Sequence, residues 1–106
     1  MTDNETIAEF DGIKLIQMRI RSFSYWENSD GDRIDYHDVN YGKYWGQFMP
    51  VWYKFKDMMT PFPYEEHWAN FSNIKEVIGF AILHKGQAEA CRLLAEGIRW
   101  YKSIKQ

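Results

Sequence analysis

The final segment of the chain, residues 86–106, constrains the fold most, because its apolar side chains recur at the spacing of an α-helix. One apolar stripe consists of Cys91, Leu94, Ile98 and Tyr101, and an adjacent stripe of Leu93, Gly97, Trp100 and Ile104. The opposite side carries Glu89, Arg92, Glu96, Arg99 and Ser103. An apolar arc near half the circumference has to pack against another element, so the pattern predicts an amphipathic helix lying on a sheet.

The stretch YWGQFMPVWYKF, residues 44–55, is the densest apolar run of the chain. The spacing i, i+3, i+4, i+7 of a helix face is followed by Trp45, Phe48, Met49, Trp52, Phe55 and Met59. Proline lacks a backbone donor and is tolerated in the first helical turn. We therefore expect a helix at about 47–59, with Pro50 near its start and the stripe from Trp45 to Phe55 in the core.

A short helix and a β-hairpin are predicted before this run. Residues 4–11 suit a helix that Asp3 or Asn4 caps and that Gly12 ends in the left-handed conformation. Alternating side chains predict one strand over residues 13–27, with a bulge before its end. The NSDGD sequence of 28–32 predicts a tight turn, and RIDYHDV at 33–39 predicts the returning strand.

Residues 60–73 contain two prolines and are predicted to form a loop. The run that follows, IKEVIGFAIL at 74–83, is short and continuous, which leaves both a buried strand and a helix open. Its β-branched residues and Gly79 favour the strand.

These elements predict an α+β fold, with a small, mainly antiparallel sheet and helices packed on it. The 106 residues correspond to a single domain, 1–106. Aromatic residues make up 18% of the chain, a surplus that suggests that both sheet faces are covered. We therefore expect a three-layer α/β/α sandwich, with some aromatic side chains left at the surface.

Charge and composition narrow the classes of function. The net charge of −2 argues against general nucleic-acid binding, which needs a basic face. Cys91 is the only cysteine, so no intrachain disulfide is expected. No run approaches the ~18 apolar residues of a membrane span, and the first residues lack the apolar region of a secretory signal. We expect a cytoplasmic protein without membrane contact.

No residue pattern points clearly to catalysis, a metal or a cofactor. An acidic group around the predicted hairpin consists of Glu27, Asp30, Asp32, Asp35 and Asp38, with His37 beside it. Turns select Asp for backbone reasons, and the ligand order of an EF-hand is absent, so we expect no metal site. His67 and His84 lie outside any ligand pair, and Cys91 lies on an apolar stripe, where a buried, inert thiol is expected. We predict neither an enzyme nor a cofactor.

Aromatic side chains around the central helix are the candidate binding residues. The whole group, Tyr41, Tyr44, Trp45, Tyr53, Phe62, Tyr64 and Trp68, is too large for the core alone. Tyr and Trp supply much contact area at little entropic cost, which suits a surface for a second copy or for a partner. The binding residues that we predict are Tyr41, Tyr44, Tyr53, Tyr64 and Trp68.

Three segments resemble a family of small phage and prophage proteins, the "ABA sandwich" domain. IAEF at 7–10, followed by Gly12, resembles the start of these proteins, and IRWY at 98–101 resembles their closing F-I-K-W-Y. YWGQFMPVWYKF resembles their W-x-x-L-M-P-V-V-E-K-I segment, although Gly46 and Gln47 stand where the family has Asp and Trp. The resemblance implies an α/β/α layered fold and a viral or prophage origin, and it implies no catalytic residues.

Three hypotheses for the function follow. The first is a non-catalytic phage-type accessory or interaction domain that self-associates through aromatic surface. The second is a protein that binds or sequesters a small, nucleotide-like ligand between aromatic rings and scattered arginines. The third and weakest is a metal-dependent hydrolase that uses Asp35, His37 and Asp38.

Overall fold

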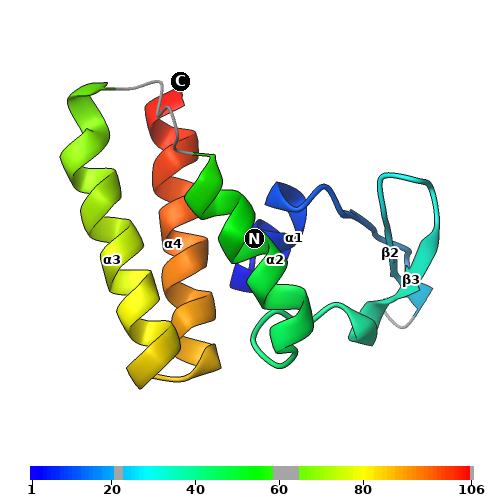
Figure 1. The fold of residues 1–106 in the computed structure, drawn as a ribbon. Coiled ribbons are helices and arrows are strands. Elements are labelled where there is room, and N and C mark those ends of the chain that lie inside the picture. Colours follow the sequence, from blue (N-terminus) through cyan, green and yellow to red (C-terminus); the bar gives the residue numbers. More distant parts are fainter. Residues whose placement is uncertain (21–22, 59–64, 106) are drawn as a thin grey trace.

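The computed structural model describes residues 1–20, 23–58 and 65–105, and over these residues the chain forms four α-helices and a three-stranded antiparallel sheet (Figure 1). The α+β class predicted from the sequence is therefore confirmed.

Helix α1, Asp3–Phe10, begins one residue earlier than expected. Its cap is Thr2, whose hydroxyl oxygen accepts a hydrogen bond from the N–H of Glu5 at 3.1 Å, so the prediction of Asp3 or Asn4 as the cap is wrong. The side chain of Asn4 bonds elsewhere. It donates to the carbonyl of Val39 at 2.7 Å and accepts from the N–H of Tyr41 at 2.9 Å, which ties α1 to the segment before α2.

The end of α1 follows the prediction. Gly12 has a φ of +85°, a conformation that side-chain-bearing residues rarely adopt. The N–H groups of Gly12 and Ile13 donate to the carbonyls of Glu9 and Ala8 at 3.1 and 2.8 Å, which is the Schellman arrangement. This turn sends the chain directly into the sheet.

The sheet consists of β1 (Lys14–Ile16), β2 (Tyr25–Glu27) and β3 (Arg33–Asp35), with β2 in the centre. Trp26 faces Leu15 on one side and Ile34 on the other. The prediction of one strand over 13–27 is wrong, because its two ends form separate strands that pair with each other. Pairing on both sides satisfies the backbone N–H and C=O groups of β2. Met18 and Ile20, which were expected on a strand face, lie exposed between β1 and β2.

The predicted hairpin between β2 and β3 is confirmed. The side-chain oxygen of Asn28 accepts hydrogen bonds from the N–H groups of Asp30 and Asp32, and Gly31 has a positive φ. The returning strand is shorter than expected, since Tyr36–Asp38 form a turn of 3₁₀-helix.

Helix α2, Trp45–Asp57, begins and ends two residues before the prediction. Pro50 consequently lies in the second turn and not near the start. Phe48, Trp52 and Phe55 are buried as expected, but Trp45 is partly exposed, and its ring meets Phe48 edge to face. Met59 lies outside the described residues.

Helix α3, Trp68–His84, follows a 3₁₀ turn at Glu65–His67. The strand favoured for residues 74–83 is therefore wrong, and so is the loop over 68–73, while residues 60–64 lie outside the described part. Lys85 and Gly86 join α3 to α4, Gln87–Lys105, and Gly86 has a φ of +93°. The predicted last helix is confirmed.

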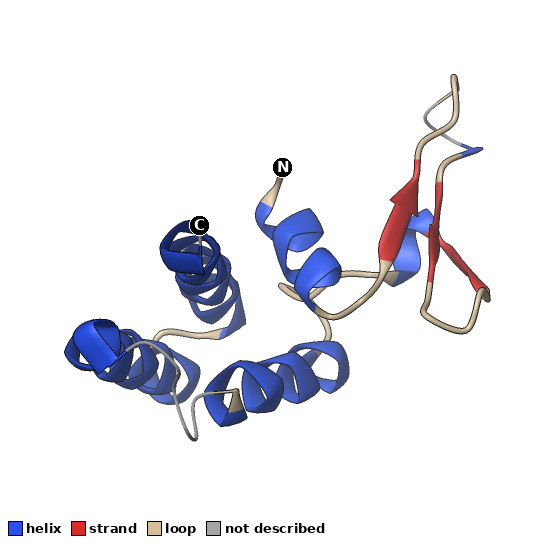
Figure 2. Ribbon diagram, turned by 90° about the horizontal axis from the view of Figure 1, so that it is seen from above, coloured by secondary structure: helices blue, strands red, loops and turns tan. Residues whose placement is uncertain are grey.

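The helices lie side by side, with the sheet next to α1 (Figures 1 and 2). Helix α4 makes its main contacts with α1, α3 and α2, so its apolar stripe, including Leu94 and Ile98, is buried among helices. Residues 74–83, which were expected to form a strand, belong to helix α3. The apolar stripes of α2 and α4 therefore pack mainly against other helices and not against a sheet. The expected three-layer sandwich is therefore not the arrangement seen. Trp26 joins the sheet to the common core.

Candidate interaction surface on α3 and α4

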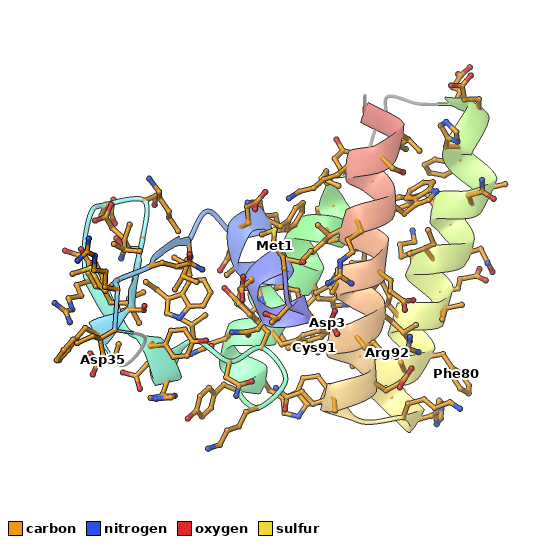
Figure 3. All side chains as sticks on the ribbon, turned by 180° about the vertical axis from the view of Figure 1, so that it is seen from behind. Met1, Asp3, Asp35, Phe80, Cys91 and Arg92 are labelled. Atoms are coloured by element: carbon orange, nitrogen blue, oxygen red, sulfur yellow. The ribbon has the colours of Figure 1, made fainter. Side chains whose placement is uncertain are left out.

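Helix α3 carries apolar side chains on every side. Its inner face buries Phe71, Ile78 and Ala81. Its outer face leaves Val77, Phe80 and Leu83 exposed at 43%, 55% and 78% of their surface. Figure 3 shows Phe80 pointing away from α4 on the outside of the molecule. The outer face also carries the exposed polar side chains of Asn73, Glu76 and His84, so it is a mixed surface with an exposed apolar row.

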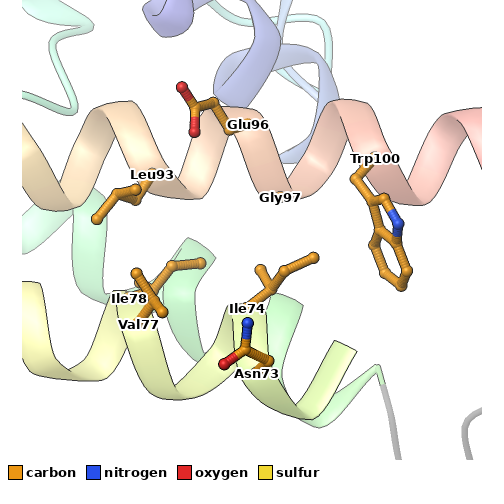
Figure 4. A pocket seen from close by; sticks show the side chains of 8 residues that line it. All are labelled: Asn73, Ile74, Val77, Ile78, Leu93, Glu96, Gly97 and Trp100. Atoms are coloured by element: carbon orange, nitrogen blue, oxygen red, sulfur yellow. The ribbon is translucent and has the colours of Figure 1, made fainter. Parts of the chain in front are cut away.

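An apolar groove runs between α3 and α4 beside these exposed residues (Figure 4). One part has a volume of about 310 Å³, and Ile74, Val77 and Ile78 of α3 line it opposite Leu93, Gly97 and Trp100 of α4. Asn73 and Glu96 supply its polar edge. An adjoining hollow shares Val77 and Leu93 with it and reaches Phe80 and Ala81. We call the exposed face of α3 together with this groove the α3–α4 surface.

Ion pairs occupy the charged edge of the groove on α4. The guanidinium of Arg92 donates to the carboxylates of Glu89 and of Glu96, the latter at 2.6 Å. The hydrogen bond from Arg92 lowers the pKa of Glu89, and the same pairing raises the pKa of Arg92. These charges therefore satisfy each other along the helix, and the centre of the surface stays apolar.

His84 supports the exposed ring of Phe80. The two residues are one helical turn apart, and their ring centroids lie 4.6 Å from each other. The imidazole thus restricts the positions that the phenyl ring takes at the surface. His67, the other histidine of this region, meets Trp100 edge to face.

The binding residues predicted from the sequence are dispersed. Tyr41 is only 1% exposed, so the expectation that its ring lies at the surface is wrong. Its hydroxyl donates to the half-buried carboxylate of Asp11 at 2.9 Å. Tyr44 and Tyr53 are partly exposed at α2, where Lys43 and Lys56 lie over their rings. Nine residues separate them, about two and a half helical turns, so they occupy opposite sides of α2.

Of the other two predicted binding residues, Trp68 is described by the structure and Tyr64 is not. Trp68 is the first residue of α3 and is about half exposed, so it lies on the helix that carries the new surface. Tyr64 and its neighbour Phe62 lie outside the described residues.

Sequence reasoning missed Val77, Phe80 and Leu83 because they belong to the run that was assigned to a buried strand. The available signal was the length of the segment without proline, which contains polar as well as apolar residues. From Trp68 to His84 no proline interrupts it, and seventeen residues exceed the length of an ordinary strand.

The acidic group around the hairpin forms no assembled site. Within residues 1–20, 23–58 and 65–105, no group of three or more His, Cys, Asp or Glu side chains is placed to hold a metal ion. Asp30 and Asp32 follow the turn that Asn28 organises, and His37 and Asp38 lie in the 3₁₀ turn rather than on a strand.

Cys91 is buried, as the sequence predicts. Burial, with a smaller contribution from the nearby charge of Asp3, raises the pKa of its thiol to about 11. Because the thiolate is the reactive form, this environment keeps the sulfur unreactive at neutral pH.

Comparison of the chain with protein-family models, with curated proteins and with solved structures finds no significant match. Among the described helices, none is long and apolar enough to cross a membrane.

Proposed function

We propose that this chain is a non-catalytic interaction domain that self-associates through the α3–α4 surface. The observation that supports the proposal is the exposed apolar row of Val77, Phe80 and Leu83 on a helix whose other side is already in the core. Removing apolar surface from water contributes roughly 25 cal/mol per Å², so a second copy that covers this row gains stability.

The size of the surface agrees with a dimer. Helices α3 and α4 have 17 and 19 residues, which gives a face ~25 Å long at the rise of an α-helix. Packed helices lie ~8–10 Å apart, so the pair is ~20 Å wide. A face of these dimensions covers ~500 Å² per partner, or ~1,000 Å² in total, which is the size of a weak or transient protein interface.

Recognition of a nucleotide has less support from the groove. A phosphate group requires an unpaired cation, whereas Arg92 at this edge is held by two carboxylates. Lys85, the other cation at the adjoining hollow, lies near the carboxylate of Glu89, and the groove itself is lined by apolar side chains apart from Asn73 and Glu96. This lining suits a hydrophobic side chain better than a charged ligand.

We also propose a phage or prophage origin, with the protein acting in the cytoplasm of the host cell. The support for this part is the resemblance of residues 7–12, 44–55 and 98–101 to the phage "ABA sandwich" proteins.

Light scattering coupled to size-exclusion chromatography tests the proposal. The wild-type chain should elute with twice the mass of one 12.8 kDa chain at tens of micromolar. Phe80→Glu places a charge in the centre of the surface and should give a monomer. Tyr53→Glu makes the same change at an exposed ring of α2 and should stay dimeric. A wild-type chain that remains monomeric at millimolar concentration would refute self-association.

A further inference from the structure

We infer that the free edge of β1, together with a groove between this strand and α1, binds an extended peptide segment of a partner protein that carries a lysine or an arginine. The bound segment adds a strand to the three-stranded sheet and directs its basic side chain at Glu5. The groove shares no residue with the α3–α4 surface, so the inference does not depend on the proposed self-association.

The outer side of β1 has unpaired backbone groups. Across the hairpin, the N–H of Asn28 donates to the carbonyl of Asp32 at 3.0 Å, so Trp26, two residues earlier, also directs its backbone groups at β3. The residues on either side of Trp26 therefore pair with β1, and their partners are the residues on either side of Leu15. Leu15 itself directs its N–H and C=O away from β2, where none of the described residues bonds to them.

Two adjoining hollows lie between this edge and α1. One has a volume of about 440 Å³ and is lined in part by Trp26, and the other has about 310 Å³ and is lined in part by Tyr36. Glu5 of α1 borders both hollows, as do Leu15 and Gln17, so these three residues lie where the hollows meet. A helix beside a sheet edge often covers that edge, whereas here the hollows leave room for another chain.

The carboxylate of Glu5 determines which occupant fits the groove. Glu5 is partly buried, its carboxylate accepts a hydrogen bond from the hydroxyl of Thr2 at 3.2 Å, and it forms no ion pair with any residue that the structure describes. Glu9, the other carboxylate of the groove, is paired with Lys102. Glu5 is therefore the acidic group that is available to a cation from outside.

The basic side chains of the groove, Lys14 and Arg19, leave Glu5 open. Each of them borders only one of the two hollows. Lys14 precedes Leu15 in the strand, so its side chain points to the opposite face of the sheet. Arg19 is exposed between β1 and β2, and within the described part of the chain it takes part in no ion pair.

An antiparallel strand fits the open edge and the charge at the same time. The residue opposite Leu15 exchanges both backbone hydrogen bonds with it. Directly paired residues point to the same face of a sheet, so the side chain of this residue enters the groove beside Glu5. A lysine or arginine lays its methylene groups on Leu15 and brings its charge to the carboxylate. In recognition of this kind, the main-chain bonds give affinity and the side chain gives specificity.

An NMR titration with a defined peptide tests the inference. The probe is acetyl-Thr-Val-Thr-Lys-Thr-Val-Thr-amide, whose lysine and valines share one face of an extended strand. The amide signals of Leu15 and Gln17 should shift with a dissociation constant on the order of 1 mM, because a few main-chain hydrogen bonds and one ion pair support only weak binding. Signals of these residues that do not move at five times this concentration overturn the inference.

Two altered peptides separate the parts of the recognition. Methylation of the lysine amide nitrogen removes the donor to the carbonyl of Leu15 and should abolish the shifts. Replacement of the lysine by glutamate places a second carboxylate beside Glu5 and should weaken binding more than about tenfold. A methylated peptide that binds unchanged refutes the strand pairing, and a glutamate peptide that binds unchanged refutes the role of Glu5.

Substitutions in the protein test the same contacts. Glu5→Gln removes the charge, while the glutamine keeps the bond with Thr2 at the start of α1, so the fold is retained. It should weaken binding of the lysine peptide about fivefold, whereas Glu76→Gln, at an exposed carboxylate of α3, should not change it. Leu15→Pro removes the outward N–H, a change that edge strands tolerate, and should abolish binding.

Light scattering separates this inference from the proposed function. Glu5→Gln should elute with the same mass as the wild-type chain, because the groove takes no part in the self-association. A monomeric wild-type chain that binds the lysine peptide refutes the self-association alone. A dimeric chain whose Leu15 and Gln17 signals do not respond to the peptide refutes the groove alone.

Discussion

Tyr41 and Asp11 form a partly buried polar contact between the end of α1 and the segment that leads into α2. The Tyr41 hydroxyl donates to the Asp11 carboxylate at 2.9 Å. Burial, and to a smaller extent the charge of Asp11, raises the pKa of Tyr41, so the phenol stays protonated at all ordinary pH values. We expect Tyr41→Phe to lower the free energy of unfolding by about 1–2 kcal/mol, because a half-buried carboxylate loses its donor. Urea denaturation measures this loss. Tyr53→Phe, at an exposed ring, is the control and should change stability by less than about 0.5 kcal/mol.

Asp11 also makes a pH-dependent contribution to stability. Burial raises its pKa above 3.8, although the hydrogen bond from Tyr41 and the charge of Lys54 oppose the shift. The folded state therefore binds the proton more tightly than the unfolded state does. This contribution is full below the unfolded pKa and is lost as the pH rises through the folded pKa.

The variant Asp11→Asn isolates this contribution because its amide does not titrate. The free energy of unfolding of the wild type, minus that of Asp11→Asn, should decrease from pH 4 to pH 7. Parallel urea titrations across this range measure the difference. A difference that increases with pH would show that the hydrogen bond from Tyr41 outweighs burial.

At the scale of elements, two glycines distinguish tight from loose helix contacts. A Cβ atom at Gly97 of α4 would lie 3.1 Å from both the Ile74 side chain of α3 and the Phe55 ring of α2. At Gly79 of α3, the atom nearest to an added Cβ would be 4.0 Å away, on Trp52. We expect Gly97→Ala to destabilise the fold by about 1 kcal/mol, because overpacking outweighs the gain in helix propensity. Gly79→Ala should stabilise it by about 0.5–1 kcal/mol. Urea midpoints with the same sign for both variants would contradict this account.

The elements that the sequence predicts well are those whose signals are local. The amphipathic period of α4, the left-handed glycine after α1 and the Asn28 turn each depend on neighbouring residues, and each is found in the structure. The stripe of α2 was identified for the same reason. Its start was misplaced because Pro50 is tolerated in the second turn.

Features that depend on residues far apart in the sequence could not be predicted from local patterns. Tyr41 is buried and bonds to Asp11, which lies thirty positions away in the sequence. No residue near Tyr41 in the chain indicates that its ring is buried. Within the run at 74–83, Ile74, Ile78, Ala81 and Ile82 have the spacing of a helix face, but the apolar residues of the outer face fall between them and obscure this period. The same property that hid the helix therefore produces the candidate surface, and it also removed the strand on which the expected layers depended.

At the scale of the whole molecule, the sheet and the α3–α4 surface lie at opposite ends. The Cα atoms extend over 44 × 32 × 21 Å, and Figure 1 shows α3 at one end of this shape and the hairpin of β2 and β3 at the other. Three amide side chains from three helices bond to the segment before α2, which lies between the two ends. The side chain of Asn4 in α1 bonds to Val39 and Tyr41, and that of Gln87 in α4 bonds to the carbonyl of Tyr41. The side chain of Gln47 in α2 accepts from the N–H of Asn40. A dimer formed through α3 would consequently direct both sheets outward.

Such a dimer couples folding to protein concentration. If the folded chain associates and the unfolded chain does not, the midpoint of thermal unfolding rises with concentration by mass action. For two chains of 106 residues we expect an increase of about 3 °C for each tenfold increase in concentration. Differential scanning calorimetry from ten micromolar to one millimolar measures this slope. Phe80→Glu should unfold at a midpoint that does not depend on concentration, whereas Tyr53→Glu should keep the wild-type slope. A slope that survives in Phe80→Glu would assign the association to another face of the molecule, because the exposed ring of Phe80 would then contribute nothing to it.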